Sequence, residues 1–239
     1  MPDSENFVVL SMLLAYQQFE IQNPVSKELK QYTVKSGIER ISQQYGVAAA
    51  QIRDQYLVIE DDNSYGWSLS TTASYLTLGL TNSVVRPVNQ ITPEQADALF
   101  SAQPDWLASA IISLYKWTEA NASFRIGFVT ALTSGQVPSP LANFISLASY
   151  TGHHAHRSPR SRAYAYLCLL VLRILTEDPQ TARSICSNQD RYVIGLCRHR
   201  SPRLATTEKK QLPVAALLNV LLDTTAHNMK KAIDISFHT

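Results

Sequence analysis

The chain of 239 residues carries a formal net charge of +2, with 45% hydrophobic and 17% charged residues, a balance that is typical of globular proteins and excludes a disordered chain. Its three cysteines form no paired motif, which excludes a disulfide-rich secreted scaffold and indicates free thiols in a reducing compartment. The longest apolar run, 163–175, is too short for a membrane span, which needs about 20 residues. The first residues lack the basic start of a secretory signal, so we expect a cytoplasmic protein without a transmembrane helix.

Apolar residues recur at helical spacing along the first 150 residues and predict a series of helices with short polar links. Prolines and glycines mark their ends: Pro93 suits a first helical position, Pro104 interrupts the chain, and Gly46 is expected to end a helix. Residues 67–85 contain threonines that favour a strand, but their apolar positions match a helical face, and we predict a helix. The expected helices cover residues 5–21, 24–45, 47–59, 67–85, 93–103, 106–120, 121–132 and 141–150.

The second part of the chain is organised around an apolar helix predicted at 163–175, which follows a basic loop at 153–162. Apolar residues occupy nearly every face of this helix, and a helix of that kind is normally buried on all sides. We therefore predict that it is the central core element and that Leu170 is fully buried. Further helices are expected at 179–187, 190–198 and 213–230.

These helices, with no strand ladder and no strict repeat, predict an all-α fold. The favoured architecture is an irregular armadillo/HEAT-like α-solenoid of about ten helices in a single domain over residues 1–239, and the alternative is a compact helical bundle. A solenoid cut from a longer array exposes an apolar patch on its first or last helix. The residues expected in that patch are Phe7, Leu10 and Leu14, or Leu217, Val220 and Leu221.

Basic residues concentrate in one part of the chain, since residues 151–210 carry 11 bases and 4 acids. Two basic segments within it contain six arginines, Arg157, Arg160, Arg162, Arg198, Arg200 and Arg203. If residues 179–198 act as one kinked helix, both segments lie on the same edge of the fold. The arginines then form one positive patch, suited to an acidic protein segment or an anionic membrane surface. The alternative is a pair of solvated loops without a partner.

The densest group of possible metal ligands is His153, His154 and His156. A zinc ion needs three or four ligands at defined spacing. Cys186 and Cys197 are far from these histidines in the sequence, and no paired motif supports them. We therefore expect the histidines to lie in a solvent-facing loop, and we expect no metal and no cofactor.

No residue pattern predicts catalysis, because the chain has neither a recognisable nucleophile motif nor a glycine-rich phosphate loop. The acidic group at 60–62 is expected to be solvated, so we do not expect an enzyme. The six arginines could contact phosphates, and Tyr164 and Tyr166 could stack on bases, as in an all-α viral nucleoprotein. Tyrosines within an apolar helix more often belong to the core, so nucleic-acid binding is the alternative and not the favoured function.

Several stretches together carry a family pattern. They are residues 156–162, then Tyr166, Leu169, Leu170, Leu172, Ile174, Leu175, Glu177 and Asp178, with residues 66–69, 196–202 and 214–228. This pattern resembles the armadillo-like helical domain-containing proteins, large Golgi-associated eukaryotic proteins whose fungal members were once grouped as a domain of unknown function. The resemblance extends over roughly residues 7–235 and is best over 153–228.

The resemblance implies a non-enzymatic helical scaffold that acts through protein–protein contacts in Golgi membrane trafficking. Animal members of that family are understood to bind a guanine-nucleotide exchange factor for Arf GTPases and a phosphatidylinositol 4-kinase. These two proteins are therefore the expected partners, with a position at the cytoplasmic face of Golgi membranes. The family pattern contains no catalytic or ligand-binding residues. Its members are much longer, so the chain is expected to be a fragment or a short member.

Overall fold

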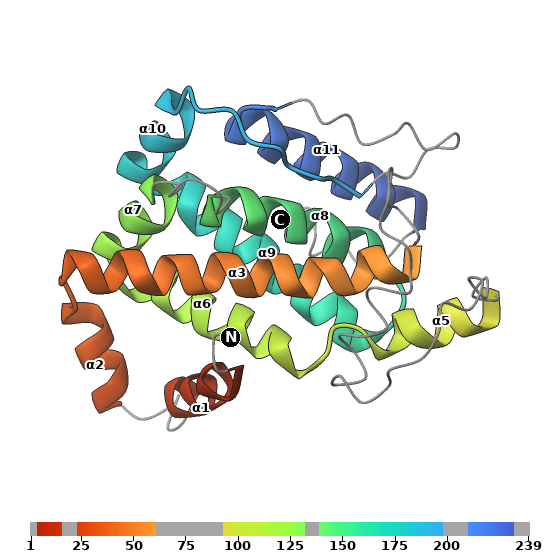
Figure 1. Ribbon diagram of the computed structural model, residues 1–239, viewed down its shortest axis with the longest axis horizontal. Coiled ribbons are helices and arrows are strands. Elements are labelled where there is room, and N and C mark those ends of the chain that lie inside the picture. Colours follow the sequence, from red (N-terminus) through yellow and green to blue (C-terminus); the bar gives the residue numbers. More distant parts are fainter. Residues whose placement is uncertain (1–3, 16–22, 61–92, 132–138, 198–209, 232–239) are drawn as a thin grey trace, which may run out of the picture.

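The computed structural model shows a helical protein (Figure 1). The residues described are 4–15, 23–60, 93–131, 139–197 and 210–231. The helices are α1 (Ser4–Ala15), α2 (Pro24–Gln31), α3 (Lys35–Glu60), α5 (Pro93–Ala102), the short 3-10 helix η1 (Trp106–Ala108), α6 (Ser109–Ala120), α7 (Ala122–Thr130), α8 (Pro140–His154), α9 (Pro159–Glu177), α10 (Pro179–Ser187) and α11 (Pro213–Lys231). The all-α class is confirmed, while the solenoid form and the single domain stay predictions. The helix expected at 67–85 lies outside the described residues.

Helix α8 lies at the centre of the molecule, with α3 in front of it, α9 behind it and α11 along its upper side in Figure 1. Every residue of α8 except His153 is buried, and α3 makes the most extensive contact with it. A helix surrounded in this way has no solvent-facing stripe on which polar residues could remain hydrated. Its polar side chains must therefore find partners inside the protein.

The hydroxyl groups of α8 do find such partners. Ser146 donates a hydrogen bond to the carbonyl oxygen of Gly195. The Ser149 hydroxyl accepts a hydrogen bond of 2.9 Å from the backbone N–H of Cys197. Thr151 donates to the carbonyl oxygen of Leu147, one turn earlier in the same helix, at 3.1 Å. Two of these three hydroxyls thus hold the segment before residue 198 against α8.

Helix α9, which was predicted to be the central element, packs on one side only. Ala165, Cys168 and Leu175 face the core, whereas Tyr166 is 38% exposed and Leu170 is only partly buried. The prediction that Leu170 is fully buried is therefore wrong. The reason is that α9 lies in an outer layer, where only the stripe at i, i+3 and i+4 spacing meets neighbours.

Helix α3 runs through Gly46, so the helix end expected at this glycine is wrong. A Cβ atom on Gly46 would lie 2.7 Å from the Cα atom of Pro140. The missing side chain therefore allows the start of α8 to approach α3 closely, which is a packing role and not a turn.

The chain breaks instead between α2 and α3, at residues 32–34. The Asn121 side chain donates hydrogen bonds to the carbonyl oxygens of Leu29, at 2.7 Å, and Tyr32, at 2.8 Å. Its other amide atom, Oδ1, accepts a hydrogen bond of 2.7 Å from the N–H of Phe124 and so caps α7. One buried asparagine thus stabilises the end of α2 and the start of α7.

The helix predicted at 190–198 is also wrong, since the described residues 188–197 are not helical. Tyr192 and Gln211 exchange two backbone hydrogen bonds of 3.0 and 2.8 Å in an isolated antiparallel bridge. The Gln211 side chain donates a further bond of 2.9 Å to the carbonyl oxygen of Ile194. This segment is held in an extended form by pairing with residues distant in sequence, which its own residues do not predict.

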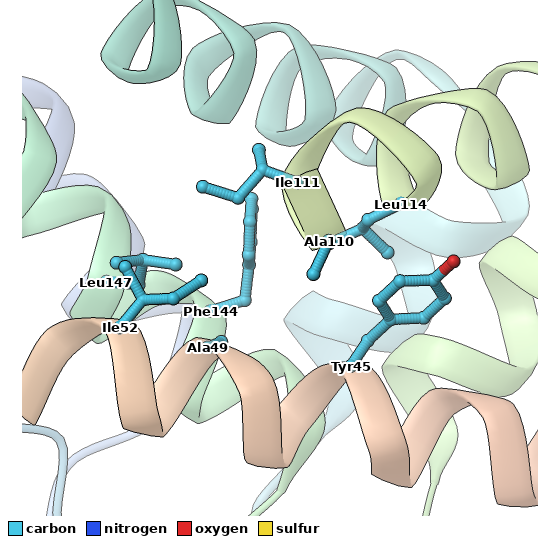
Figure 2. Close-up of a pocket in the computed structure, with 8 residues that line it drawn as sticks. All are labelled: Tyr45, Ala49, Ile52, Ala110, Ile111, Leu114, Phe144 and Leu147. Atoms are coloured by element: carbon cyan, nitrogen blue, oxygen red, sulfur yellow. The ribbon is translucent and has the colours of Figure 1, made fainter. Parts of the chain in front are cut away.

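The core contains a small apolar cavity of about 10 Å³ where α3, α6 and α8 meet (Figure 2). Its lining consists of Tyr45, Ala49, Ile52, Ala110, Ile111, Leu114, Phe144 and Leu147. A buried water needs two or more polar partners, so a cavity lined in this way is expected to stay dry. Figure 2 shows the Phe144 ring between residues of α3 and α6, which makes Phe144 a bridge between three helices.

We predict that Phe144→Ala lowers the free energy of unfolding by about 3–5 kcal/mol, because it removes a fully buried ring and enlarges this cavity. Leu170→Ala is the matched control on α9 and should cost about 1 kcal/mol, since that side chain is only partly buried. Chemical denaturation followed by circular dichroism measures both values. An equal or larger loss for Leu170→Ala would contradict the central position of α8.

Candidate functional site

The turn between α8 and α9 is shorter than the predicted basic loop, because α8 continues to His154 and α9 begins at Pro159. Ser158 caps α9, its hydroxyl accepting a hydrogen bond of 3.1 Å from the N–H of Ser161. The Ser161 hydroxyl donates in turn to the carbonyl oxygen of Gln103 at 2.9 Å. The start of α9 is therefore attached to the end of α5.

Two of the six arginines in the predicted patch take part in the same attachment. Arg157 forms an ion pair with Asp97 of α5, and its guanidinium group lies 4.8 Å from the centre of the Phe100 ring. Arg160 donates a hydrogen bond to the carbonyl oxygen of Ala102. Both arginines therefore stabilise the position of α5, in addition to any contact with a partner.

The remaining arginines divide between exposed and undescribed positions. Arg162 is exposed on the first turn of α9. Arg198, Arg200 and Arg203 lie outside the described residues. A single patch of six arginines stays a prediction.

The structure brings four of the chain's six histidines together at the end of α8. The His153 ring centre lies 4.8 Å from that of His154 and 4.6 Å from that of His227 on α11. The ring centre of His156 lies 5.4 Å from that of His227. Their placement in a solvent-facing loop is wrong for His154, which is 1% exposed, and His153 and His156 are partly buried.

Cys197 completes this group, although it is distant from the histidines in sequence. The possible ligand atoms of His153, His154 and Cys197 all lie within 4.8 Å of one another. Cys197 is buried, and its backbone is held by Ser149, one helical turn before His153. The distance in sequence was the reason to dismiss these residues, and the fold removes that reason. We call His153, His154, Cys197 and His227 the His/Cys cluster.

Neighbouring residues fix the positions of His154 and His227. The His154 ring is stacked between Tyr56 and Phe100, with ring centres at 5.2 and 4.4 Å. A Cβ atom on Gly152 would lie 2.8 Å from the hydroxyl of Thr224, so the missing side chain allows α11 to approach the end of α8. His227 follows Thr224 by three residues on the same face of α11. No ligand spacing in the sequence could reveal this site, because its residues come from three separate segments.

The two other cysteines differ from Cys197 in their surroundings. Cys168 is buried in α9, and this burial raises the pKa of its thiol to about 12, against a smaller lowering by Thr151. A thiol with such a high pKa stays protonated and unreactive near neutral pH. Cys186 is exposed on α10.

Helix α11 has two apolar faces. Its inner face contains Ala216, Leu217 and Val220, which are buried. Its outer face presents Leu218, Leu221, Leu222 and Met229, which follow i, i+3, i+4 and i+11 spacing and are 37–72% exposed. We call these four residues the α11 stripe. An apolar patch on the last helix was predicted, but from Leu217 and Val220, which face inward; of the predicted residues on this helix, Leu221 is exposed.

Comparison with known proteins gives one distant relative. The chain is 23% identical over 223 residues to a UPF0588 membrane protein of Schizosaccharomyces pombe, a match that covers 92% of the chain and 35% of the relative. The chain therefore spans about a third of the length of this relative. No family model and no solved structure matches it. Within the described residues, no helix is both long and apolar enough to cross a membrane.

We predict that Arg157→Ala loosens α5, because it removes both the ion pair with Asp97 and the contact with the Phe100 ring. Each contact contributes up to about 1 kcal/mol, so together they contribute up to about 2 kcal/mol, and amide hydrogen exchange in α5 should become up to about thirtyfold faster. The control is Arg162→Ala, which removes an exposed arginine from the first turn of α9. Equal exchange in α5 for both variants would show that Arg157 does not hold this helix.

Proposed function

We propose that this chain is a non-enzymatic helical scaffold that binds a partner protein through the α11 stripe. The observation that carries the proposal is the exposure of Leu218, Leu222 and Met229, which are 55%, 68% and 72% exposed along one line of the helix. Contiguous exposed apolar residues on a folded protein mark interaction surfaces.

The shape of the α11 stripe favours an amphipathic helix as the partner element. The stripe spans 12 residues from Leu218 to Met229, or about 16 Å at the rise of an α-helix. A helix placed along it would present its own apolar residues at i, i+3, i+4 and i+7, as in helix-in-groove recognition. Such a contact buries apolar area on both partners and needs no change in the backbone of α11.

The family resemblance supplies the partner class and the location. It favours an exchange factor for Arf GTPases and a phosphatidylinositol 4-kinase as partners, in membrane trafficking at the Golgi. The similar fission-yeast protein is named a membrane protein, which supports a role at a membrane surface. We therefore propose that the chain acts in the cytoplasm, peripherally bound at Golgi membranes.

We predict that Leu218→Glu combined with Leu222→Glu weakens binding to the exchange factor or the kinase at least tenfold, because two charges would be buried in an apolar contact. Titration of the purified chain against each purified candidate measures the affinity. The control is Val193→Glu, which places a charge at an exposed apolar residue outside the stripe, 58% exposed in the segment before α11.

The variants must keep the melting temperature of the original chain, since only then does the comparison report on the contact surface. Binding that is lost in the double variant and retained in Val193→Glu would support the proposal. Absence of binding to both candidates, or equal binding by all variants, would contradict it.

A further inference from the structure

We propose that the His/Cys cluster is a binding site for a divalent transition metal ion, with zinc as the ion that its ligands favour. His153, His154 and Cys197 supply two imidazoles and one thiol whose ligand atoms already lie within 4.8 Å of one another. Imidazole nitrogen and thiolate sulfur are the usual ligands of protein-bound zinc.

The geometry requires only a small adjustment to reach tetrahedral coordination. Ligand atoms around zinc lie about 3.3–3.6 Å apart, as bonds of about 2.0–2.1 Å to nitrogen and about 2.3 Å to sulfur require. The present spacing of up to 4.8 Å would close by roughly 1 Å. His153 is the partly buried member of the three, so its ring can turn most easily.

His227 lies next to these three ligands and would have to turn toward them to become the fourth. Its ring centre lies 4.6 Å from that of His153, and only 7% of the residue is exposed. His156 lies beside His227, and its Nδ1 atom is 3.1 Å from the carbonyl oxygen of His153. This hydrogen bond attaches the turn after α8 to the end of that helix.

Two features of the backbone bring the ligands to this place. Gly152 allows α11 to approach α8, which positions His227 next to His153. The hydrogen bond from the Cys197 N–H to Ser149 fixes the end of the segment 188–197 against α8. The ligands thus come from three segments, and the attachments that hold them are formed within the protein itself.

With His227 as the fourth ligand, the site would be a structural one and not a catalytic one. Four protein ligands fill the coordination of a tetrahedral ion and leave no open position for substrate. On binding, the Cys197 thiol releases its proton to solvent, and the histidines bind as neutral imidazoles. The ion would then join α8, the segment 188–197 and α11, and its binding energy would add to the stability of the fold.

Ordinary aromatic packing is the competing account of these histidines. Stacking between Tyr56 and Phe100 explains why His154 is buried, since an imidazole packs well between aromatic rings. It does not explain why the thiol of Cys197 and the ring of His153 converge on the same point. The proposal therefore depends on the thiol, and the test is designed around it.

The experiment is a titration of the purified, metal-free chain with Co²⁺, followed by absorption spectroscopy. We expect one cobalt ion per chain, thiolate-to-cobalt charge transfer in the near ultraviolet and the intense visible bands of tetrahedral cobalt. Cys197→Ser should lose the charge-transfer band and weaken cobalt binding more than about 100-fold. Removal of a residue that only supports a ligand, without binding the metal, costs about 10- to 100-fold. Cys186→Ser, which removes the exposed thiol of α10, should bind like the original chain.

Zn²⁺ gives a second readout, because an ion that binds only the folded chain raises its melting temperature. The rise should occur in the original chain and in Cys186→Ser, and be lost in Cys197→Ser. If Cys197→Ser does not fold, His153→Gln replaces it and should weaken cobalt binding at least tenfold. A missing charge-transfer band in the original chain would overturn the proposal. So would a band that persists in Cys197→Ser, or unchanged affinity in His153→Gln.

Discussion

The rest of the structure depends on one constraint, which is that every residue of α8 except His153 is buried. A helix with neighbours on every side can be packed closely only if its side chains are small where other backbones approach, and satisfied where they are polar. Ser146 and Ser149 meet both conditions, since each is small and binds the backbone of the segment 188–197. Gly46 on α3 lies against Pro140, the first residue of α8. Near the other end of α8, Gly152 lies against Thr224 on α11. The positions of α3, α11 and the segment 188–197 all follow from these contacts.

The sequence predicted those parts of the fold that depend on local chemistry. Helices start at Pro93, Pro140, Pro179 and Pro213, as predicted, because proline fits the first turn, where the N–H that it lacks would have no partner. Pro159 starts α9 in the same way, although it was expected to lie in a loop. The errors at Gly46 and at residues 190–198 have a different origin. Gly46 serves an approach between two helices, and the extended segment is paired with Gln211, so both depend on residues that are distant in sequence.

The central helix was misidentified because hydrophobicity and burial are different quantities. Helix α9 contains more large apolar residues than an outer helix needs, and Tyr166 and part of Leu170 remain in contact with solvent. Helix α8 contains serines, a threonine and an asparagine, which lower its apparent apolarity although all of them are buried. Side chains of this size are favoured where helix backbones come close together. The same effect hid the His/Cys cluster, because a buried end of α8 resembles a polar loop when only its sequence is considered.

Helix α11 connects the two proposals, since its opposite faces carry the two surfaces. Its inner face holds His227 and Thr224 against the end of α8, while its outer face presents Leu222 and Met229 to solvent. A metal ion bound by His227 would restrict the movement of α11 relative to α8, and a rigid helix loses less entropy when a partner binds along it. Substitutions in the α11 stripe, by contrast, lie on the far side of the helix from the ligands. Metal removal would therefore weaken partner binding, because α11 would be held less firmly. Changes in the α11 stripe would leave metal binding intact. An ion that contacted the partner directly would instead lose affinity when the partner is absent, so these effects identify a structural ion.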